Sequence, residues 1–299
     1  MTNERKGMLA ATVAYCIFGL SYLFSNEALD VVGDPIVLLS IRFAITFIAL
    51  NVLVLTRVMK LELKGKNLLP AVALGIIQPV LYFIMENYGL MYTSTAFTGM
   101  VSSISPIFSA IMGAIMLREN PTPKQWGFIV LSILGVMMVS LGANEGQNTL
   151  FGCLCLLGAY LSGAFYSILV RKLSRTFSSF ELTYIMFIVG FVFFGAFAFV
   201  KYGGETIQIL SGAVTNGKFI GSALYLGILA SVCAYMLVNY SLKTLPVARS
   251  TIFTSFSTVV SVVSGIVIRG DEFSLFSGIA FALMLAGVWG VNKFARTAQ

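Results

Sequence analysis

The chain has 299 residues, of which 58% are hydrophobic and 10% are charged, and its formal net charge is +7. A soluble domain is about one-quarter charged, so this chain cannot cover itself with a polar surface, and a soluble fold is excluded. Its length accommodates ten membrane-spanning helices of about 20 residues each. The positive residues lie at predicted helix ends rather than in one patch, so we expect a lipid bilayer and no nucleic acid as the partner.

Histidine is absent from the sequence, which removes the commonest metal ligand and the commonest proton carrier near neutral pH. The four cysteines all lie inside apolar segments. Cys153 and Cys155 are two residues apart, so on a helix they point to different faces and make a poor metal pair. We therefore predict no metal site and no cofactor.

Ten apolar segments follow one another along the chain, separated by charged or turn-forming residues. The breaks include Asp34-Pro35 and Gly203-Gly204, through which a helix does not continue cheaply. The predicted spans cover residues 7–26, 35–57, 68–91, 95–117, 124–142, 150–172, 178–200, 217–242, 248–269 and 273–294.

The distribution of lysine and arginine predicts the orientation of these spans, because cytoplasmic loops carry an excess of positive residues. With a cytoplasmic N-terminus, 15 positive residues fall at inner helix ends and loops, against three (Lys201, Lys218 and Arg269) on the outer side. We therefore expect a multi-pass protein of the plasma membrane with both termini in the cytoplasm.

The second half of the sequence repeats the first. At an offset of 152 residues, Leu74-Gly75-Ile76 corresponds to Leu226-Gly227-Ile228 and Asn87-Tyr88 to Asn239-Tyr240; at an offset of 145, Tyr15 corresponds to Tyr160. The predicted units are residues 1–145 and 146–299, with five spans each. Because five is odd, the second unit enters the membrane in the opposite sense. The expected fold is an all-α integral membrane protein of two inverted five-helix repeats, an architecture of secondary transporters with a substrate site near the midplane.

Two ionisable side chains, Arg42 and Glu86, fall well inside predicted spans. Charge at such depth is costly, so it indicates function by default. Both lie toward the outer side at similar depth, and two interpretations stay open: they pair with each other, or they meet a substrate. Arg42 would attract a carboxylate, and Glu86 is the only acid placed to couple transport to protons.

Other polar side chains accompany this pair. Gln78, Tyr82 and Glu86 are spaced by four and share one helix face. Pro79 interrupts that helix and frees a backbone carbonyl, as expected beside a substrate cavity. The predicted substrate-binding residues are Tyr15, Arg42, Gln78, Tyr82, Glu86, Asn87, Tyr160, Tyr235 and Asn239.

Motifs of catalysis are missing. The sequence contains no phosphate-binding loop for ATP hydrolysis and no HExxH or GxSxG motif. The serine-rich fourth and ninth spans have no histidine to activate a nucleophile. We predict no catalytic residues and a protein that is not an enzyme.

Several motifs resemble the EamA-type branch of the drug/metabolite transporter superfamily over nearly the whole chain. The first span ends in Phe18-Gly19-Leu20-Ser21, and the second opens with Pro35 and carries Arg42. Further similarities are the run from Tyr88 through Ala96 to Pro106, Leu117-Arg118-Glu119, Gly127 and Gly135, and in the second copy Tyr240, Ala248, Gly270-Asp271-Glu272, Gly278 and Gly287. Thr258 departs from the pattern, since it stands where the first copy has Pro106.

The resemblance implies a ten-helix carrier with a central cavity formed by spans 1, 3, 4, 6, 8 and 9, and a homodimer through spans 5 and 10. Members of the family export amino acids, other metabolites or drugs, some of them coupled to protons. We expect a secondary transporter that exports a small polar metabolite, such as an amino acid, by alternating access. The alternatives are efflux of amphipathic cations, bound by Glu86 and the aromatic side chains, and an intramembrane enzyme.

Overall fold

The computed structural model describes residues 3–117, 122–141, 148–203, 205–245, 250 and 253–294, and all its elements are helical. Seven segments are long and apolar enough to cross a membrane, and three shorter apolar helices begin at Pro123, Thr254 and Leu275. Together they account for the ten predicted spans, so the predicted fold class is confirmed. The predicted positions 118–119, 142, 204, 248–249 and 251–252 lie outside the described residues.

The first half contains five spans. They are α1 (Asn3–Val32), α2 (Pro35–Leu55), the series α3 (Leu69–Gly75), η1 (Ile76–Leu81) and α4 (Tyr82–Met91), the pair α5 (Thr95–Ser102) and α6 (Ser105–Leu117), and α7 (Pro123–Leu141). The elements labelled η are π-helical. The predicted interruption of the third span is present, because Gln78 leaves helical geometry within η1.

The second half repeats this order. It contains α8 (Leu150–Leu173), α9 (Ser179–Tyr202), the short α10 (Glu205–Ala213), the series α11 (Gly217–Leu224), η3 (Tyr225–Ala234) and α12 (Tyr235–Thr244), the pair α14 (Thr254–Ser264) and η4 (Gly265–Arg269), and α15 (Leu275–Lys293). The helix α10 was not predicted. It is only nine residues long, so it falls below the length of a span.

The first helix is longer than its predicted range of 7–26. The chain stays helical to Val32 because polar side chains beyond residue 26 have partners on neighbouring spans. The carboxylate of Asp30 pairs with Arg269 at 2.9 Å, and that of Glu27 accepts a hydrogen bond from Ser222 at 3.3 Å. The C-terminal end of α1 is therefore tied to the second half.

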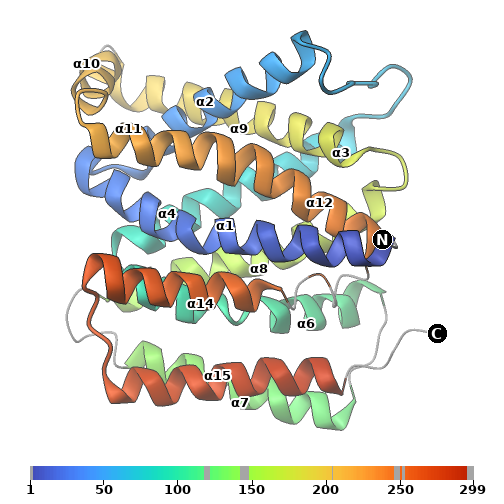
Figure 1. The fold of residues 1–299 in the computed structure, drawn as a ribbon, viewed down its shortest axis with the longest axis vertical. Coiled ribbons are helices and arrows are strands. Elements are labelled where there is room, and N and C mark those ends of the chain that lie inside the picture. The colour runs from blue at the N-terminus through green and yellow to red at the C-terminus, as the bar shows by residue number, and fades with distance from the viewer. Residues whose placement is uncertain are drawn as a thin grey trace.

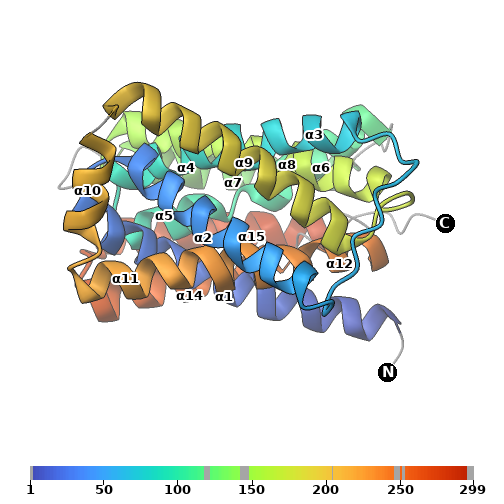
Figure 2. The same cartoon turned by 90° about the horizontal axis from the view of Figure 1, so that it is seen from above.

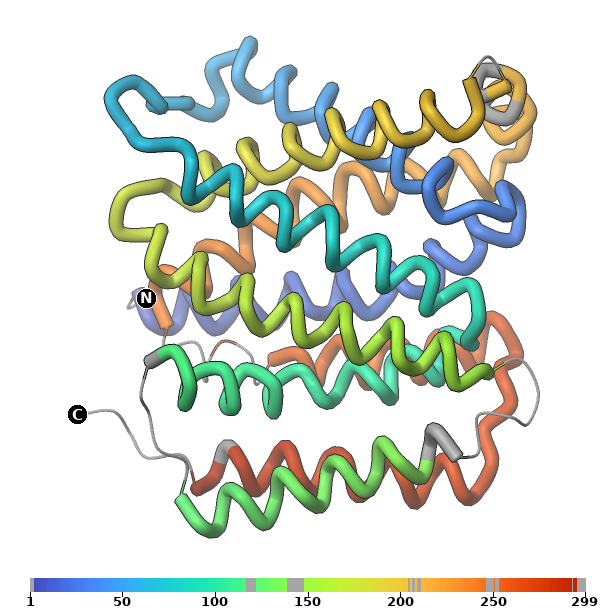
Figure 3. The backbone as a smooth tube through the Cα atoms, turned by 180° about the vertical axis from the view of Figure 1, so that it is seen from behind, coloured from blue at the N-terminus to red at the C-terminus, as the bar shows by residue number. Residues whose placement is uncertain are grey.

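The two halves are arranged in opposite senses. Figure 3 shows α1 and α8 running in opposite directions across the molecule. Corresponding helices make corresponding contacts with the other half. The helix α4 packs on α8 as α12 packs on α1, and α6 packs on α8 as α14 packs on α1. The counterparts α2 and α9, and α7 and α15, contact each other directly, and α5 contacts α14. Figure 1 places α2 and α9 at one end of the long axis and α7 with α15 at the other.

The spans all cross the same layer, which gives the molecule two faces. We call the face where α1 begins and α15 ends the termini face; it also carries the connection between α2 and α3, whereas α10 lies on the opposite face (Figure 2). On that opposite face Asp34 caps α2 and pairs with Lys201 at 2.6 Å. Partial burial alone would raise the pKa of Asp34, but hydrogen bonds from Lys201 and two backbone amides hold it below its ordinary value.

Close helix contact requires glycine where α5 meets α14. A Cβ atom added to Gly99 would lie 2.6 Å from Ser261 Oγ, and Ser261 itself donates to the Thr95 carbonyl at 2.9 Å. Ser102 and Thr258 also share a hydrogen bond of 3.1 Å across this contact. Small and hydroxylated residues thus let the two backbones approach, as is common between membrane helices.

Candidate functional site

A cavity of about 90 Å³ lies between the two halves. Its walls come from α1, η1, α4, α5, α6, α8, α12 and α14, which belong to the six spans that the resemblance implies, with α2 added through Arg42. The lining residues are Tyr15, Phe18, Ser21, Tyr22, Arg42, Gln78, Tyr82, Phe83, Glu86, Ser102, Ser105, Ser109, Tyr160, Gly163, Ala164, Tyr166, Ser167, Tyr235, Val238, Thr254 and Ser257.

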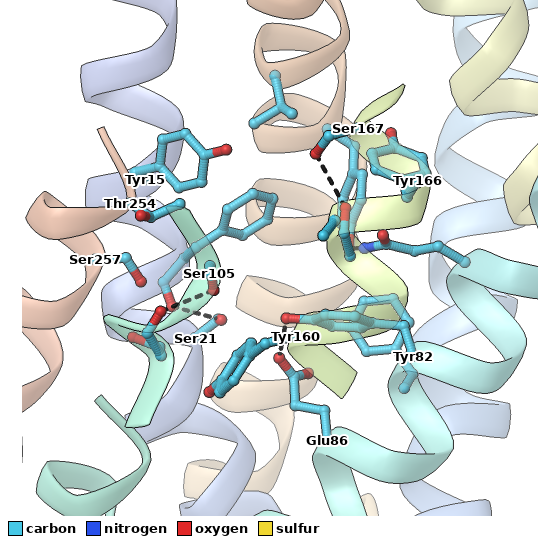
Figure 4. Close-up of a pocket in the computed structure, with 18 of the residues that line it drawn as sticks. Tyr15, Ser21, Tyr82, Glu86, Ser105, Tyr160, Tyr166, Ser167, Thr254 and Ser257 are labelled. Carbon is cyan, nitrogen blue, oxygen red and sulfur yellow. Dashed lines mark hydrogen bonds between the residues drawn. The ribbon is translucent and has the colours of Figure 1, made fainter. Parts of the chain in front are cut away.

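The only carboxylate among these lining residues is Glu86, on α4. Its side chain is 4% exposed, and Oε1 accepts a hydrogen bond of 2.7 Å from the Tyr82 hydroxyl, one helical turn earlier. Figure 4 shows this bond pointing into the cavity, whereas Ser21, Ser105 and Ser257 place their hydroxyls on the side formed by α1, α6 and α14. The site therefore has an acidic, phenolic wall and a neutral hydroxyl wall.

Arg42 enters from α2 and is almost fully buried. Its Nε donates to Ser231 Oγ at 3.0 Å, and its guanidinium carbon lies 4.2 Å from the centre of the Phe83 ring. Ser231 in turn donates to the carbonyl of Leu226, five residues earlier in η3, at 2.8 Å. No other hydrogen bond joins the guanidinium to a described residue, so both terminal nitrogens stay available to a ligand.

Arg42 and Glu86 line the same cavity without pairing. Their charged atoms do not come within the 4.0 Å of an ion pair, although both residues are described. Of the two interpretations open from the sequence, direct pairing is therefore not what the structure shows. The cavity instead presents one positive and one negative group at separate places.

The break in the third span adds an amide to the cavity. Gln78 adopts an extended conformation inside η1 (φ −145°, ψ 116°), and its Nε2 donates to the Tyr235 hydroxyl. Its Oε1 is buried without a hydrogen-bond partner among the described residues. The carbonyl of Ile77, beside the break, accepts a hydrogen bond of 2.9 Å from Ser162 on α8, as expected where a membrane helix is interrupted.

Seven of the nine predicted site residues line the cavity, and Asn87 and Asn239 do not. Asn87 donates to the Phe83 carbonyl of its own helix at 3.0 Å. Asn239 accepts from the Tyr166 hydroxyl at 2.5 Å and donates to Thr183 Oγ1 at 2.9 Å. Its position is therefore one step behind the cavity, where it orients Tyr166.

The prediction missed most of the hydroxyl groups. The repeat offsets could have indicated some of them, because they relate lining residues of the first half to lining residues of the second. At an offset of 152, Ser105 corresponds to Ser257; at 145, Tyr22 corresponds to Ser167. Both members of each pair line the cavity.

An all-helical chain of ten spans around a buried polar cavity defines a multi-pass membrane transporter for a small molecule. Residues 5–141 and 150–293 each match the EamA-like transporter family. The chain belongs to this family, which is one of transporters and not of enzymes.

Individual relatives agree with this assignment. The chain is 33% identical over 293 residues to the uncharacterized transporter YcxC of Bacillus subtilis (strain 168), covering 97% of this chain and 94% of that protein. It is 24% identical over 227 residues to a probable terminal-alkyne amino-acid exporter of Streptantibioticus cattleyicolor, covering 75% and 73% of the two chains. A solved crystal structure at 18% identity has the same fold, with a TM-score of 0.70 over 99% of this chain and 100% of that chain.

Proposed function

We propose that this transporter is a secondary carrier that exports a small zwitterionic metabolite, such as an amino acid, by alternating access. The observation that carries the proposal is the unpaired presentation of Arg42 and Glu86 in one buried cavity. The two terminal nitrogens of a guanidinium match a carboxylate, and a carboxylate with a free oxygen matches an ammonium group. The hydroxyl wall between α1, α6 and α14 suits a small polar remainder.

The size of the cavity supports a conformational cycle. Ligand pockets usually measure roughly 300–1,000 Å³, well above the 90 Å³ found here. An amino acid therefore enters only when the surrounding helices separate. We propose that the two repeats, residues 1–145 and 146–299, are the parts that rearrange around the site.

We assign direct contact with the substrate to the seven lining residues of the predicted set and a positioning role to Asn239 and Asn87. Proton coupling through Glu86 is part of this proposal. The amino-acid exporter among the relatives supports the choice of substrate class. A homodimer through α7 and α15 is a further proposal, which the exposed Trp126 and Trp289 on these helices support.

Efflux of amphipathic cations is the second candidate. The observation that favours it is the set of phenol rings around the single carboxylate: Tyr22, Tyr82 and Tyr160 line the cavity with Glu86. Aromatic faces attract cations, more strongly where water is excluded. A cation substrate would need Glu86 and would leave Arg42 without a partner.

A thermal-stability screen of the purified protein separates the candidates. We expect amino acids to raise the melting temperature, because a ligand at a hundred times its dissociation constant stabilises by about 2.7 kcal/mol. Amines without a carboxylate and lipophilic cations serve as matched probes. Stabilisation by lipophilic cations alone would favour the second candidate, and the absence of amino-acid exchange in proteoliposomes would contradict the first.

We propose that the termini face is cytoplasmic and that the membrane is the plasma membrane. The test is labelling of single cysteines in a variant lacking the four native cysteines. Thr215→Cys, between α10 and α11, should react with a membrane-impermeant maleimide in intact cells. Lys64→Cys, between α2 and α3, should react only after permeabilisation. Both positions are exposed, so the opposite pattern would reverse the orientation.

A further inference from the structure

A second polar pocket opens on the termini face, away from the central cavity. It measures about 320 Å³ and shares no lining residue with the central cavity. Its walls come from the connection between α2 and α3, the connection between α8 and α9, the start of α9 and the end of α12. Figure 2 shows these segments at the same end of the molecule. Both repeats therefore contribute to it.

The frame of this pocket is fixed by one buried carboxylate, Glu181. It is 3% exposed and accepts hydrogen bonds from the Ser178 amide at 2.7 Å and the Glu62 amide at 3.2 Å. Both its oxygens also lie 2.8 Å from Lys66 Nζ. The negative charge of Glu181 is thus balanced by Lys66, and the hydrogen bonds of its carboxylate attach both connections to the first turn of α9.

Three further cations line the pocket without a carboxylate partner. Lys60, Arg175 and Lys243 are exposed, and none forms an ion pair with a described residue. The end of α12 that carries Lys243 is held in place, since Arg171 Nη1 donates to the Lys243 carbonyl at 2.7 Å. With the Lys66–Glu181 pair neutral, three cations face one remaining carboxylate, Glu62, so the pocket has a net charge of +2.

We propose that this pocket binds a phosphate group. Three cations on three separate segments match an anion with several acceptor oxygens better than they match a single carboxylate, and arginine and lysine are the side chains that bind phosphate. Two sources present this chemistry at a membrane surface, an anionic phospholipid headgroup and a soluble phosphate. The site is independent of the proposed substrate, because it lies outside the central cavity.

The test uses the full-length protein in phosphatidylcholine nanodiscs, with the melting temperature as readout. Inorganic phosphate is titrated at constant ionic strength in one arm, and in the other arm phosphatidylglycerol replaces part of the phosphatidylcholine. We expect a saturable rise in at least one arm. A rise with inorganic phosphate identifies a soluble source, and a rise with phosphatidylglycerol alone identifies the lipid headgroup.

The variants decide whether the pocket is responsible. K60Q/R175Q/K243Q should weaken the apparent affinity at least tenfold, whereas K6Q/K64Q/K172Q removes three exposed cations of the same face outside the pocket and should leave it unchanged. Glu62→Gln should strengthen binding, because it removes the one opposing charge. If the triple variant does not fold, R175Q and K243Q are measured singly. No rise in either arm, or an equal loss in both triple variants, would overturn the proposal.

Discussion

Arg42→Gln should lower the affinity for an amino acid by at least about a hundredfold. Hydrogen bonds to charged groups contribute about 1.5–3 kcal/mol each, and 1.4 kcal/mol corresponds to a tenfold change in affinity. The guanidinium offers two terminal nitrogens that no described residue occupies, so a substrate carboxylate would lose two such bonds. Isothermal titration or ligand-induced thermal stabilisation measures the loss.

The matched probes for this result are an amine without a carboxylate and the variant Arg42→Lys. The amine should bind the wild type and Arg42→Gln equally, because it makes no use of the guanidinium. Lysine keeps the charge but not the two-nitrogen geometry, so its loss should be intermediate. Ser231→Ala, which frees Nε, should show a smaller effect of the same kind. An equal loss for amine and amino acid in Arg42→Gln would refute carboxylate binding there.

Glu86→Gln should abolish the response of transport to a pH gradient. The chain has no histidine, and Glu86 is the one carboxylate among the described residues that line the cavity. A glutamine keeps the shape of the side chain but cannot carry a proton. Uptake into proteoliposomes with an imposed pH gradient is the measurement, and the wild type should accumulate substrate where the variant only equilibrates it.

Tyr82→Phe is the control for this experiment. It removes the 2.7 Å hydrogen bond to Glu86 Oε1 and keeps the carboxylate, so gradient-driven accumulation should persist. Accumulation that survives in Glu86→Gln would exclude Glu86 as the proton carrier and leave the carrier uncoupled or coupled elsewhere. Loss of amine binding in Glu86→Gln would show that Glu86 contacts the ammonium group.

Much of the fold follows from the sequence because its signals are local. Asp34-Pro35 ends one helix and caps the next, and lysines and arginines mark helix ends. The break at Gln78-Pro79 follows from the missing amide hydrogen of proline. The far end of α1 could not be predicted from the sequence, because the partners of Glu27 and Asp30 lie on distant spans. The helix α10 was missed because its nine residues are too few for a span.

The candidate site is harder to derive, because it depends on how helices are rotated against each other. Spacing places Tyr82 and Glu86 on one face of their helix, and the structure confirms that both line one cavity. The depth of Arg42 and Glu86 within their predicted spans leaves open whether the two side chains touch, because this is set by the packing of α2 on η3. Hydroxyl residues such as Ser105 escape notice because serine between membrane helices usually serves packing. Asn239 shows the converse, since it is polar and buried but faces Tyr166.

The π-helical segment η3 sets which side chains of its span reach the cavity. It covers Tyr225–Ala234, and a π-turn holds one residue more than the α-turn that it replaces. An α-helix rotates by about 100° per residue, so every side chain after η3 owes its direction to that extra residue. If the same residues formed a regular α-helix, the extra residue would not be absorbed and the following helix would turn by about this angle. Ala234 would then stand where Tyr235 accepts its hydrogen bond from Gln78, and a methyl group would replace the phenol in the wall of the site.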